Sequence, residues 1–158
     1  MQALIMVEPK PLSKRGRASV VDVGGKLVTH HSAVARAAVR HGEKAFKLVS
    51  QNQQAKGYAL TVSQIAGILA AKQTSSLIPL CHPLTLDKVN VSLQLEESGW
   101  FAAIKATCLT SGRTGVEMEA LTAASVAALT FYDMCKAVTH DIVIQELKLL
   151  SKDFQQAT

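Results

Sequence analysis

Residues 89–109 read VNVSLQLEESGWFAAIKATCL, and this stretch decides the fold class. In its first half, apolar and polar side chains alternate with a period of two, which is typical of a strand with one buried face. The apolar positions are Val89, Val91, Leu93 and Leu95, and the polar ones are Asn90, Ser92, Gln94 and Glu96. A Ser-Gly pair at 98–99 favours a turn, and Trp100 to Leu109 then returns as a second strand. The stretch therefore predicts an antiparallel hairpin.

Downstream of the hairpin, the pattern changes to that of a long helix. The segment SGRTG at 111–115 predicts a turn, and a helix is expected from about 116 to 138. Thr114 and Glu117 have the spacing of a capping box, in which two side chains satisfy free amides at a helix start. The segment DIVIQELKLLSK at 141–152 is expected to form the last strand.

Upstream of the hairpin, the elements are shorter. Residues 20–23 predict a short extended piece, followed by a turn at Gly24-Gly25. Residues 32–40 are ambiguous, because their alanines favour a helix but few residues precede Gly42. A short helix is plausible over 43–51. Together with the hairpin, these elements predict an α+β domain.

A second helix is expected to end near residue 72. Thr61 and Gln64 again have capping-box spacing before an apolar run. The next segment, LIPLCHPL at 77–84, places Cys81 beside His82 between two prolines. Since proline disfavours helix at its own and the preceding position, we expect a non-helical loop. Two interpretations stay open: a buried structural loop, or a loop that presents both side chains to a ligand.

Length and composition are typical of one folded domain. The chain has 158 residues, of which 48% are hydrophobic, and we assign residues 18–158 to a single α+β domain with helices on one face of an antiparallel sheet. No apolar run reaches the ~18 residues needed to cross a bilayer, so no membrane partner is expected. Three widely spaced cysteines predict reduced thiols and a cytoplasmic location, with an organellar matrix left open.

The basic charge is concentrated at the N-terminus. The formal net charge is +5, and residues 1–17 carry four basic side chains against one acidic side chain. The other 141 residues carry 13 basic and 11 acidic side chains. We expect residues 1–17 to be a disordered, solvated tail. A nucleic-acid-binding domain that uses this tail is an alternative. The chain has few aromatic residues and no recognition signature for nucleic acid, so no nucleic-acid partner is expected.

The long helix carries the candidate catalytic side chains. Asp133 and Lys136 are spaced i, i+3 and share one helix face, which is also the spacing of an ordinary surface ion pair. Because their neighbours are apolar or small, we expect a largely buried helix. A carboxylate and an amine in that setting are candidates for shifted pKa values and proton transfer. Glu119 is a further candidate, since capping does not explain it.

The spacing along this helix limits how a site can be built. Glu119 and Asp133 are 14 positions apart, which is about 21 Å at ~1.5 Å per residue. Both side chains therefore cannot reach one small reacting centre within a single chain. We expect a site shared between chains, with close packing of a partner against the helix's small residues, Ala120, Ala123, Ala124, Ser125, Ala127 and Ala128.

Single cations give weaker candidates. Lys56 lies in a polar loop, and Lys72 complements the dipole of a helix end. Arg113 precedes the long helix, whose free amides are suited to a phosphate. No P-loop or serine-nucleophile motif occurs. Adjacent Cys81 and His82 would struggle to bind one ion, so no metal site is expected.

Taken together, the segments resemble the cyclic pyranopterin monophosphate synthase family, the molybdenum cofactor biosynthesis protein C (MoaC) family. The matching stretches are VVDVGGK (20–26), IAGILAAKQTSSLIPLCHPL (65–84), TGVEMEALTAASVAALTFYDMCKAV (114–138) and residues 141–152. The resemblance implies a ferredoxin-like α+β fold. It also implies a lyase that rearranges a cyclised dihydro-GTP into cyclic pyranopterin monophosphate and releases pyrophosphate, in a homohexamer built as a trimer of dimers with shared sites.

The resemblance also assigns roles to residues. It implies that the catalytic side chains are Asp133, Lys136 and Lys56. It implies that the substrate contacts are Leu80, Cys81, His82, Met118, Glu119 and Lys72. We add Arg113 and Lys152 as phosphate contacts. No resident cofactor is expected, although Mg²⁺ accompanying the triphosphate stays open.

Two departures from the family pattern concern phosphate binding. Many family members have a Gly-Gly-Lys-Ser-Gly-like loop after the position of Lys152, whereas here Lys152 runs directly into Asp153-Phe154. His31 stands where an arginine is common. These departures leave an alternative: a catalytically impaired family member that acts as a binding or scaffold protein.

Overall fold

A computed structural model describes residue 16 and residues 18–53 and 58–156. Of the predicted N-terminal tail over residues 1–17, only Gly16 is therefore described, and Lys56 also lies outside the described residues. The elements in chain order are β1 (Thr29–Arg40), α1 (Gly42–Ser50), α2 (Ala59–Lys72), α3 (Thr74–Leu77), β2 (Lys88–Glu96), β3 (Phe101–Gly112), α4 (Glu117–Cys135) and β4 (Val143–Gln156).

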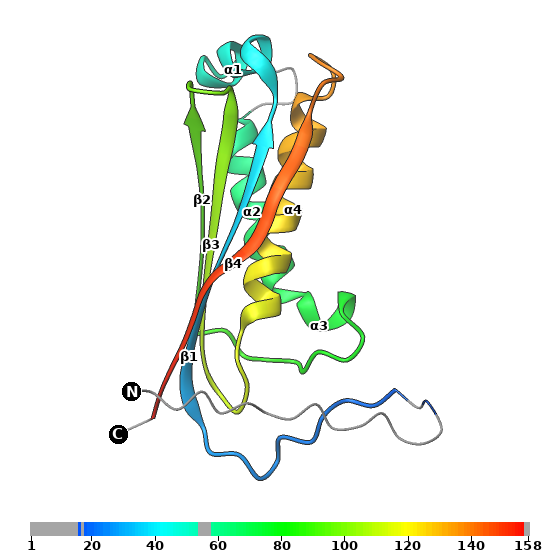
Figure 1. Cartoon of the computed structure of the whole chain (residues 1–158), viewed down its shortest axis with the longest axis vertical. Coiled ribbons are helices and arrows are strands. Elements are labelled where there is room, and N and C mark those ends of the chain that lie inside the picture. Colours follow the sequence, from blue (N-terminus) through cyan, green and yellow to red (C-terminus); the bar gives the residue numbers. More distant parts are fainter. Residues whose placement is uncertain (1–15, 17, 54–57, 157–158) are drawn as a thin grey trace.

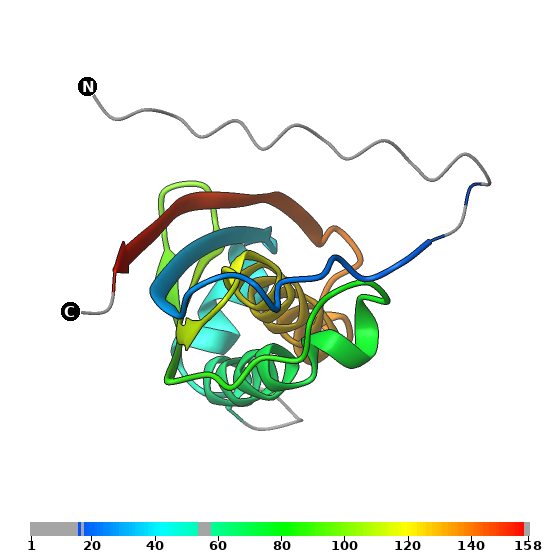
Figure 2. The same cartoon turned by 90° about the horizontal axis from the view of Figure 1, so that it is seen from below.

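The four strands form one antiparallel sheet in the order β2-β3-β1-β4. Helices α2 and α4 cover one face of this sheet, and α1 lies at the end where β1 finishes (Figures 1 and 2). This arrangement confirms the predicted α+β fold, its ferredoxin-like topology and the 89–109 hairpin. None of the described helices is long and apolar enough to cross a membrane.

The alanine-rich segment that was ambiguous in the sequence is β1, one of the two inner strands of the sheet. Ala35 pairs with Ala106 of β3 on one side and with Leu149 of β4 on the other. Its inward side chains are small and fully buried, as are those on the facing side of α4. Small residues on both surfaces let the helix approach the sheet closely, so tertiary packing overrides the helix preference of alanine.

The small residues of α4 are part of this core. Ala120, Ala123, Ala124, Ala127 and Ala128 are each 0% exposed within the single chain. The prediction that a partner packs against them is therefore wrong. The sheet and α2 already occupy that side of the helix. The sequence pattern does not reveal this, because α4 has too few polar residues to distinguish a core face from a partner face.

Both predicted capping boxes are also wrong. Helix α2 begins at Ala59, so Thr61 lies inside the helix, and the Gln64 side chain instead donates its Nε2–H to the Val91 carbonyl at 2.8 Å. Helix α4 has no side-chain bond at its N-cap, and Glu117 pairs with Lys152 at 3.5 Å. In both cases a contact across the fold has replaced the local one.

The last strand is longer and less regular than expected. Strand β4 continues past Lys152 to the end of the described chain, where Phe154 pairs with His31 of β1. Its register with β1 shifts twice, and Glu146 has a φ of 58°, which marks β-bulges. Leu147 and Leu150 lie at these shifts and are each 48% exposed. Residues 20–23 join no strand, while the turn at 24–25 is present.

Candidate active site

The LIPLCHPL loop leaves the helical region as the prolines predict. Helix α3 ends at Leu77, and the chain then turns and runs extended to β2. This path brings the Cys81 Sγ to 3.8 Å from the Glu119 Oε1 on the first turn of α4. His82 donates its Nε2–H to the Val21 carbonyl at 2.6 Å. The loop therefore joins the N-terminal segment to the start of α4.

Glu119 is a buried acid at the centre of this cluster. Its residue is 3% exposed, and its Oε2 has no hydrogen-bond partner among the described residues. Burial raises the pKa of its carboxyl group, and the neighbouring Glu117 carboxylate raises it further, against its hydrogen bonds. A carboxyl group with a raised pKa keeps its proton to a higher pH than an exposed carboxyl group does, which suits a role in proton transfer.

Two thiols share the environment of Glu119. Burial raises the pKa of Cys81, and the negative charge of Glu119 raises it further. Burial raises the pKa of Cys108 to about 12, with a smaller contribution from Glu119. All three cysteines are free, as predicted. Cys81 is therefore a neutral hydrogen-bond donor here rather than a thiolate nucleophile.

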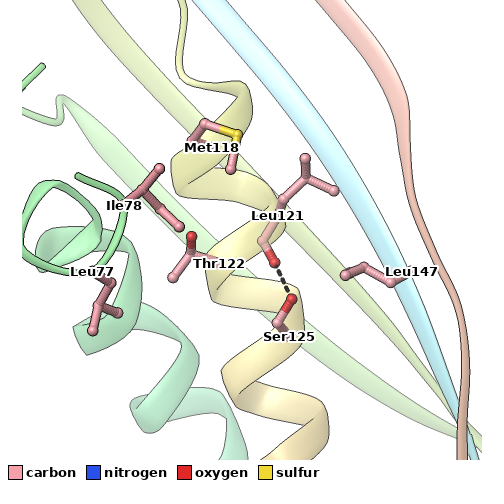
Figure 3. Close-up of a pocket in the computed structure, with 7 residues that line it drawn as sticks. All are labelled: Leu77, Ile78, Met118, Leu121, Thr122, Ser125 and Leu147. Atoms are coloured by element: carbon pink, nitrogen blue, oxygen red, sulfur yellow. Dashed lines mark hydrogen bonds between the residues drawn. The ribbon is translucent and has the colours of Figure 1, made fainter. Parts of the chain in front are cut away.

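An apolar pocket lies beside the first turns of α4. Its volume is about 450 Å³, and Figure 3 shows side chains from α3, α4 and β4 around it. The lining residues are Leu77, Ile78, Met118, Leu121, Thr122, Ser125 and Leu147. The Ser125 hydroxyl donates to the Leu121 carbonyl at 2.7 Å, so it is already satisfied. The pocket has the size and the largely apolar lining that suit a flat heterocycle.

The two predicted phosphate contacts and the remaining predicted substrate contacts lie in segments near the start of α4. Lys152 pairs with Glu117 at the start of α4, and its side chain is 69% exposed. Arg113 is exposed in the connection between β3 and α4. Lys72 is exposed at the end of α2. Exposed Leu80 and the half-exposed Met118 lie in the segments that flank the pocket.

The other predicted pair lies at the opposite end of α4. Lys136 Nζ is 2.7 Å from Asp133 Oδ1, and their side chains are 56% and 50% exposed. The expectation of a buried pair is therefore wrong for the single chain. The hydrogen bond and charge of Asp133 raise the pKa of Lys136, so the ammonium form of this lysine is stabilised in the single chain. Asp133 lies in the last turn of α4 and Lys136 is its C-cap. Both side chains reach solvent because the helix ends here, at Cys135.

One chain therefore holds two separate clusters. Glu119 lies in the first turn of α4 and Asp133 in its last turn, and Figure 1 shows that these two helix ends lie near opposite ends of the strands, on the same face of the sheet. The length argument from the sequence holds, since α4 is a single helix from Glu117 to Cys135. Among the described residues, no group of three His, Cys, Asp or Glu side chains could hold a metal ion.

The structure adds contacts that sequence reasoning missed. The segment around Val21 lies against His82, and the Glu117–Lys152 pair joins α4 to β4. For the first contact, the sequence signal is the turn that shapes this segment, in which Asp22 is followed two positions later by Gly24. In the structure, the Asp22 side chain accepts the Gly24 amide at 2.8 Å. The second gave no local signal, since 35 positions separate its partners.

Comparisons with known proteins agree on one family. The MoaC family matches residues 20–154. The mouse (Mus musculus) protein named "Molybdenum cofactor biosynthesis protein 1" is 60% identical over 137 residues, which cover 87% of this chain and 22% of that protein. The human (Homo sapiens) protein of the same name is 57% identical over 141 residues, covering 89% and 22%.

A fly relative shows the same relationship. The Drosophila melanogaster protein with that name is 54% identical over 147 residues, which cover 90% of this chain and 26% of that protein. The chain thus spans about a quarter of the length of these relatives. The family match covers the loop, the pocket and both ends of α4. The chain belongs to the MoaC family.

Proposed function

We propose that this chain is a lyase of molybdenum cofactor biosynthesis, which converts a cyclised dihydro-GTP into cyclic pyranopterin monophosphate and releases pyrophosphate. Family membership and the printed name of the relatives support a role in this pathway. The observation that carries the chemistry is the division of the site residues between the two ends of α4. That division is what a site built by two chains requires.

The cluster at the start of α4 is suited to the heterocycle. The pocket beside Met118 supplies an apolar surface, and Cys81 and His82 lie in the loop that continues from the pocket residue Ile78. Glu119 supplies a proton reservoir, since its carboxyl pKa is raised by burial. Opening and closing rings in the substrate needs protons to be added and removed at fixed positions, which buried carboxyl groups perform well.

The cluster at the end of α4 is suited to a second task. Asp133 holds the Lys136 ammonium group at 2.7 Å, and in a single chain this pair faces solvent. Covered by another chain, the pair would lose water and its proton affinities would change. Lys136 would then donate or accept a proton, while Asp133 positions it. Lys152, Arg113 and Lys72, with Lys56, would balance the charge of the departing pyrophosphate.

The assembly we propose is a homohexamer built as a trimer of dimers, with each site shared between chains. Exposed apolar side chains support further contacts between chains. At the N-cap of α2 and along this helix they are Tyr58, Val62, Ile65 and Leu69, and on β4 they are Val143, Ile144, Leu147 and Leu150. Rows of this kind are uncommon on proteins that work alone. We propose no resident cofactor, with Mg²⁺ only as a companion of the triphosphate, and a cytoplasmic or organellar-matrix location.

The deciding experiment is incubation of the protein with the cyclised dihydro-GTP. Pyrophosphate release and the pterin product should both appear, and Asp133→Asn should abolish both while leaving the circular dichroism spectrum and the oligomer size unchanged. Substrate binding without any product from the wild-type protein would instead favour the scaffold alternative. Neither binding nor turnover would reject both.

A further inference from the structure

A buried histidine at the end of β1 has a polar atom without a partner. His41 is 1% exposed and lies between β1 and α1. Its Nδ1 is 3.2 Å from the Gly42 carbonyl oxygen, which can only accept, so Nδ1 carries the hydrogen. The other ring nitrogen, Nε2, is then an acceptor, and it has no hydrogen-bond partner among the described residues. A buried polar atom of this kind reduces stability and calls for an explanation.

The ring of His41 is the centre of an aromatic cluster. It stacks on Phe46 of α1 at 6.2 Å with an interplanar angle of 17°, and it lies 5.2 Å from the Phe131 ring of α4. Phe46 in turn meets Trp100 edge-on at 5.2 Å. The His41 amide also donates to the Trp100 carbonyl at 3.0 Å. The cluster therefore joins α1, the β2–β3 turn and α4.

The cluster is suited to a neutral ring and unsuited to a charged one. Burial lowers the pKa of His41, and the Gly42 carbonyl only partly opposes this. Protonation would place a new N–H donor on Nε2, where the described residues supply no acceptor. The titratable and charged groups closest in sequence to the ring and to its contacts are Arg40, Glu43, Lys44, Lys47, Glu96, Glu97, Tyr132, Asp133, Cys135 and Lys136. None of them contributes to the lowered pKa.

Phe131 links this cluster to a predicted catalytic pair. Phe131 is 0% exposed and precedes Asp133 by two positions in the last turns of α4. Lys136, the C-cap of the same helix, pairs with Asp133. Any movement that loosens the Phe131 side chain would therefore also loosen the helix end that holds both charged groups. Interiors are close-packed, so such a movement changes the whole contact rather than one atom.

We propose that His41 is a positioning residue that makes the Asp133–Lys136 end of α4 sensitive to pH. The neutral ring seats Phe131 and holds α1 and Trp100 against α4. Protonation in mild acid separates these three elements and moves the charged pair out of place. The catalytic consequence rests on the proposed function, whereas the structural switch does not.

Trp100 is the only tryptophan in the chain and reports on the switch directly. Its fluorescence would be followed from about pH 7.5 to about pH 5 in the wild-type protein and in His41→Phe, with His41→Gln as a second non-titrating variant. The matched control is His140→Gln, which removes an exposed histidine. We expect a reversible transition in the wild type and the control, with a midpoint below the ordinary histidine value of about 6.5, and none in the His41 variants.

Two outcomes would overturn the proposal. One is a wild-type protein with no transition in this range. The other is the same transition in a folded His41 variant. If neither variant folds, the His41 ring protons followed by NMR in the wild type decide. Titration at an ordinary histidine midpoint, with unchanged Phe131 and Trp100 signals, would exclude the switch.

Turnover gives the second readout. Below the midpoint we expect the wild type to lose up to about tenfold in turnover per pH unit, and His41→Phe to lose less. Identical acid limbs in both proteins would reject the link from His41 to the Asp133–Lys136 end. Absence of turnover at every pH would reject the proposed function instead, while the fluorescence result would still stand.

Discussion

Gly67 of α2 lies so close to Ala123 of α4 that a Cβ at position 67 would be 2.9 Å from the Ala123 carbonyl oxygen. The same atom would lie 3.2 Å from the Ala127 Cβ and 3.2 Å from the Val91 Cγ1 of β2. A backbone oxygen inside a helix cannot move aside as the end of a flexible side chain can. Glycine at this position therefore sets the distance between the two helices and the sheet.

Gly67→Ala should destabilise the protein through this contact. Overpacking of this kind costs about 1–3 kcal/mol, offset in part by the roughly 0.5–1 kcal/mol that alanine gains over glycine inside a helix. Urea unfolding should show a lower midpoint at an unchanged slope. Gly25→Ala is the control, because a Cβ there meets nothing within 4 Å. Equal midpoints for Gly67→Ala and the wild type would mean that the helices separate without cost.

Glu119→Gln should stabilise the fold in a pH-dependent way. Burial raises the pKa of Glu119 above its unfolded value, so the folded state holds the proton more tightly. The wild type then loses stability as pH rises from about 4.5 through the folded pKa, whereas glutamine does not titrate. The advantage of the variant should be small near pH 4 and larger near pH 7.5. Urea midpoints at both values measure it, with exposed Glu97→Gln as the control. A constant difference across pH would show that Glu119 titrates normally.

Mixed oligomers should recover activity that each parent lacks. Glu119→Ala and Lys136→Ala remove residues from opposite ends of α4, and we expect each protein alone to be inactive. After subunit exchange, some shared sites combine an intact Glu119 from one chain with an intact Lys136 from another. Pyrophosphate release should then return to a fraction of the wild-type rate. Its absence in mixtures whose exchange is verified by mass spectrometry would count against shared sites.

Restoring the family's glycine-rich loop should strengthen substrate binding. In this chain β4 runs without interruption through Lys152 and Asp153, which pair with Ala33 and Ser32. A Gly-Gly-Lys-Ser-Gly insertion between them would loop out of this edge strand and offer a lysine and free amides to the triphosphate. The dissociation constant should fall, and more so at low salt, where charge interactions are less screened. A Gly-Gly-Ser-Ser-Gly insertion is the control, and equal affinity for both would assign no role to the lysine.

Local patterns were enough to predict much of the fold. The period-two alternation before Gly99, the strand pattern after it and the long apolar stretch after Gly115 predict β2, β3 and α4. The bounds differ, since β3 extends to Gly112 in the predicted turn and α4 ends at Cys135 rather than near 138. The two prolines beside Cys81 predict a non-helical loop, since the constraint acts within neighbouring residues. The separation of Glu119 from Asp133 also follows from the sequence, because the rise of a helix is constant.

Contacts between distant segments decided the rest. The alanines of β1 favour a helix in isolation, yet strands on both sides recruit the segment into the sheet. Gln64 and Glu117 were expected to cap their own helices, but each found a partner on a strand far along the chain. Local spacing identifies a group that can cap, whereas the fold determines which partner comes nearer.

The electrostatics of the site belong entirely to the tertiary structure. From the sequence, Asp133 and Lys136 looked buried and Glu119 was only an unexplained acid on the same apolar helix. In the fold, the first pair faces solvent and Glu119 is 3% exposed beside Cys81. The sequence determined which side chains share a helix and how far apart they lie, because these follow from backbone geometry. Which of them lose water, and so change their pKa values, depends on what packs against them, and only the folded chain decides that.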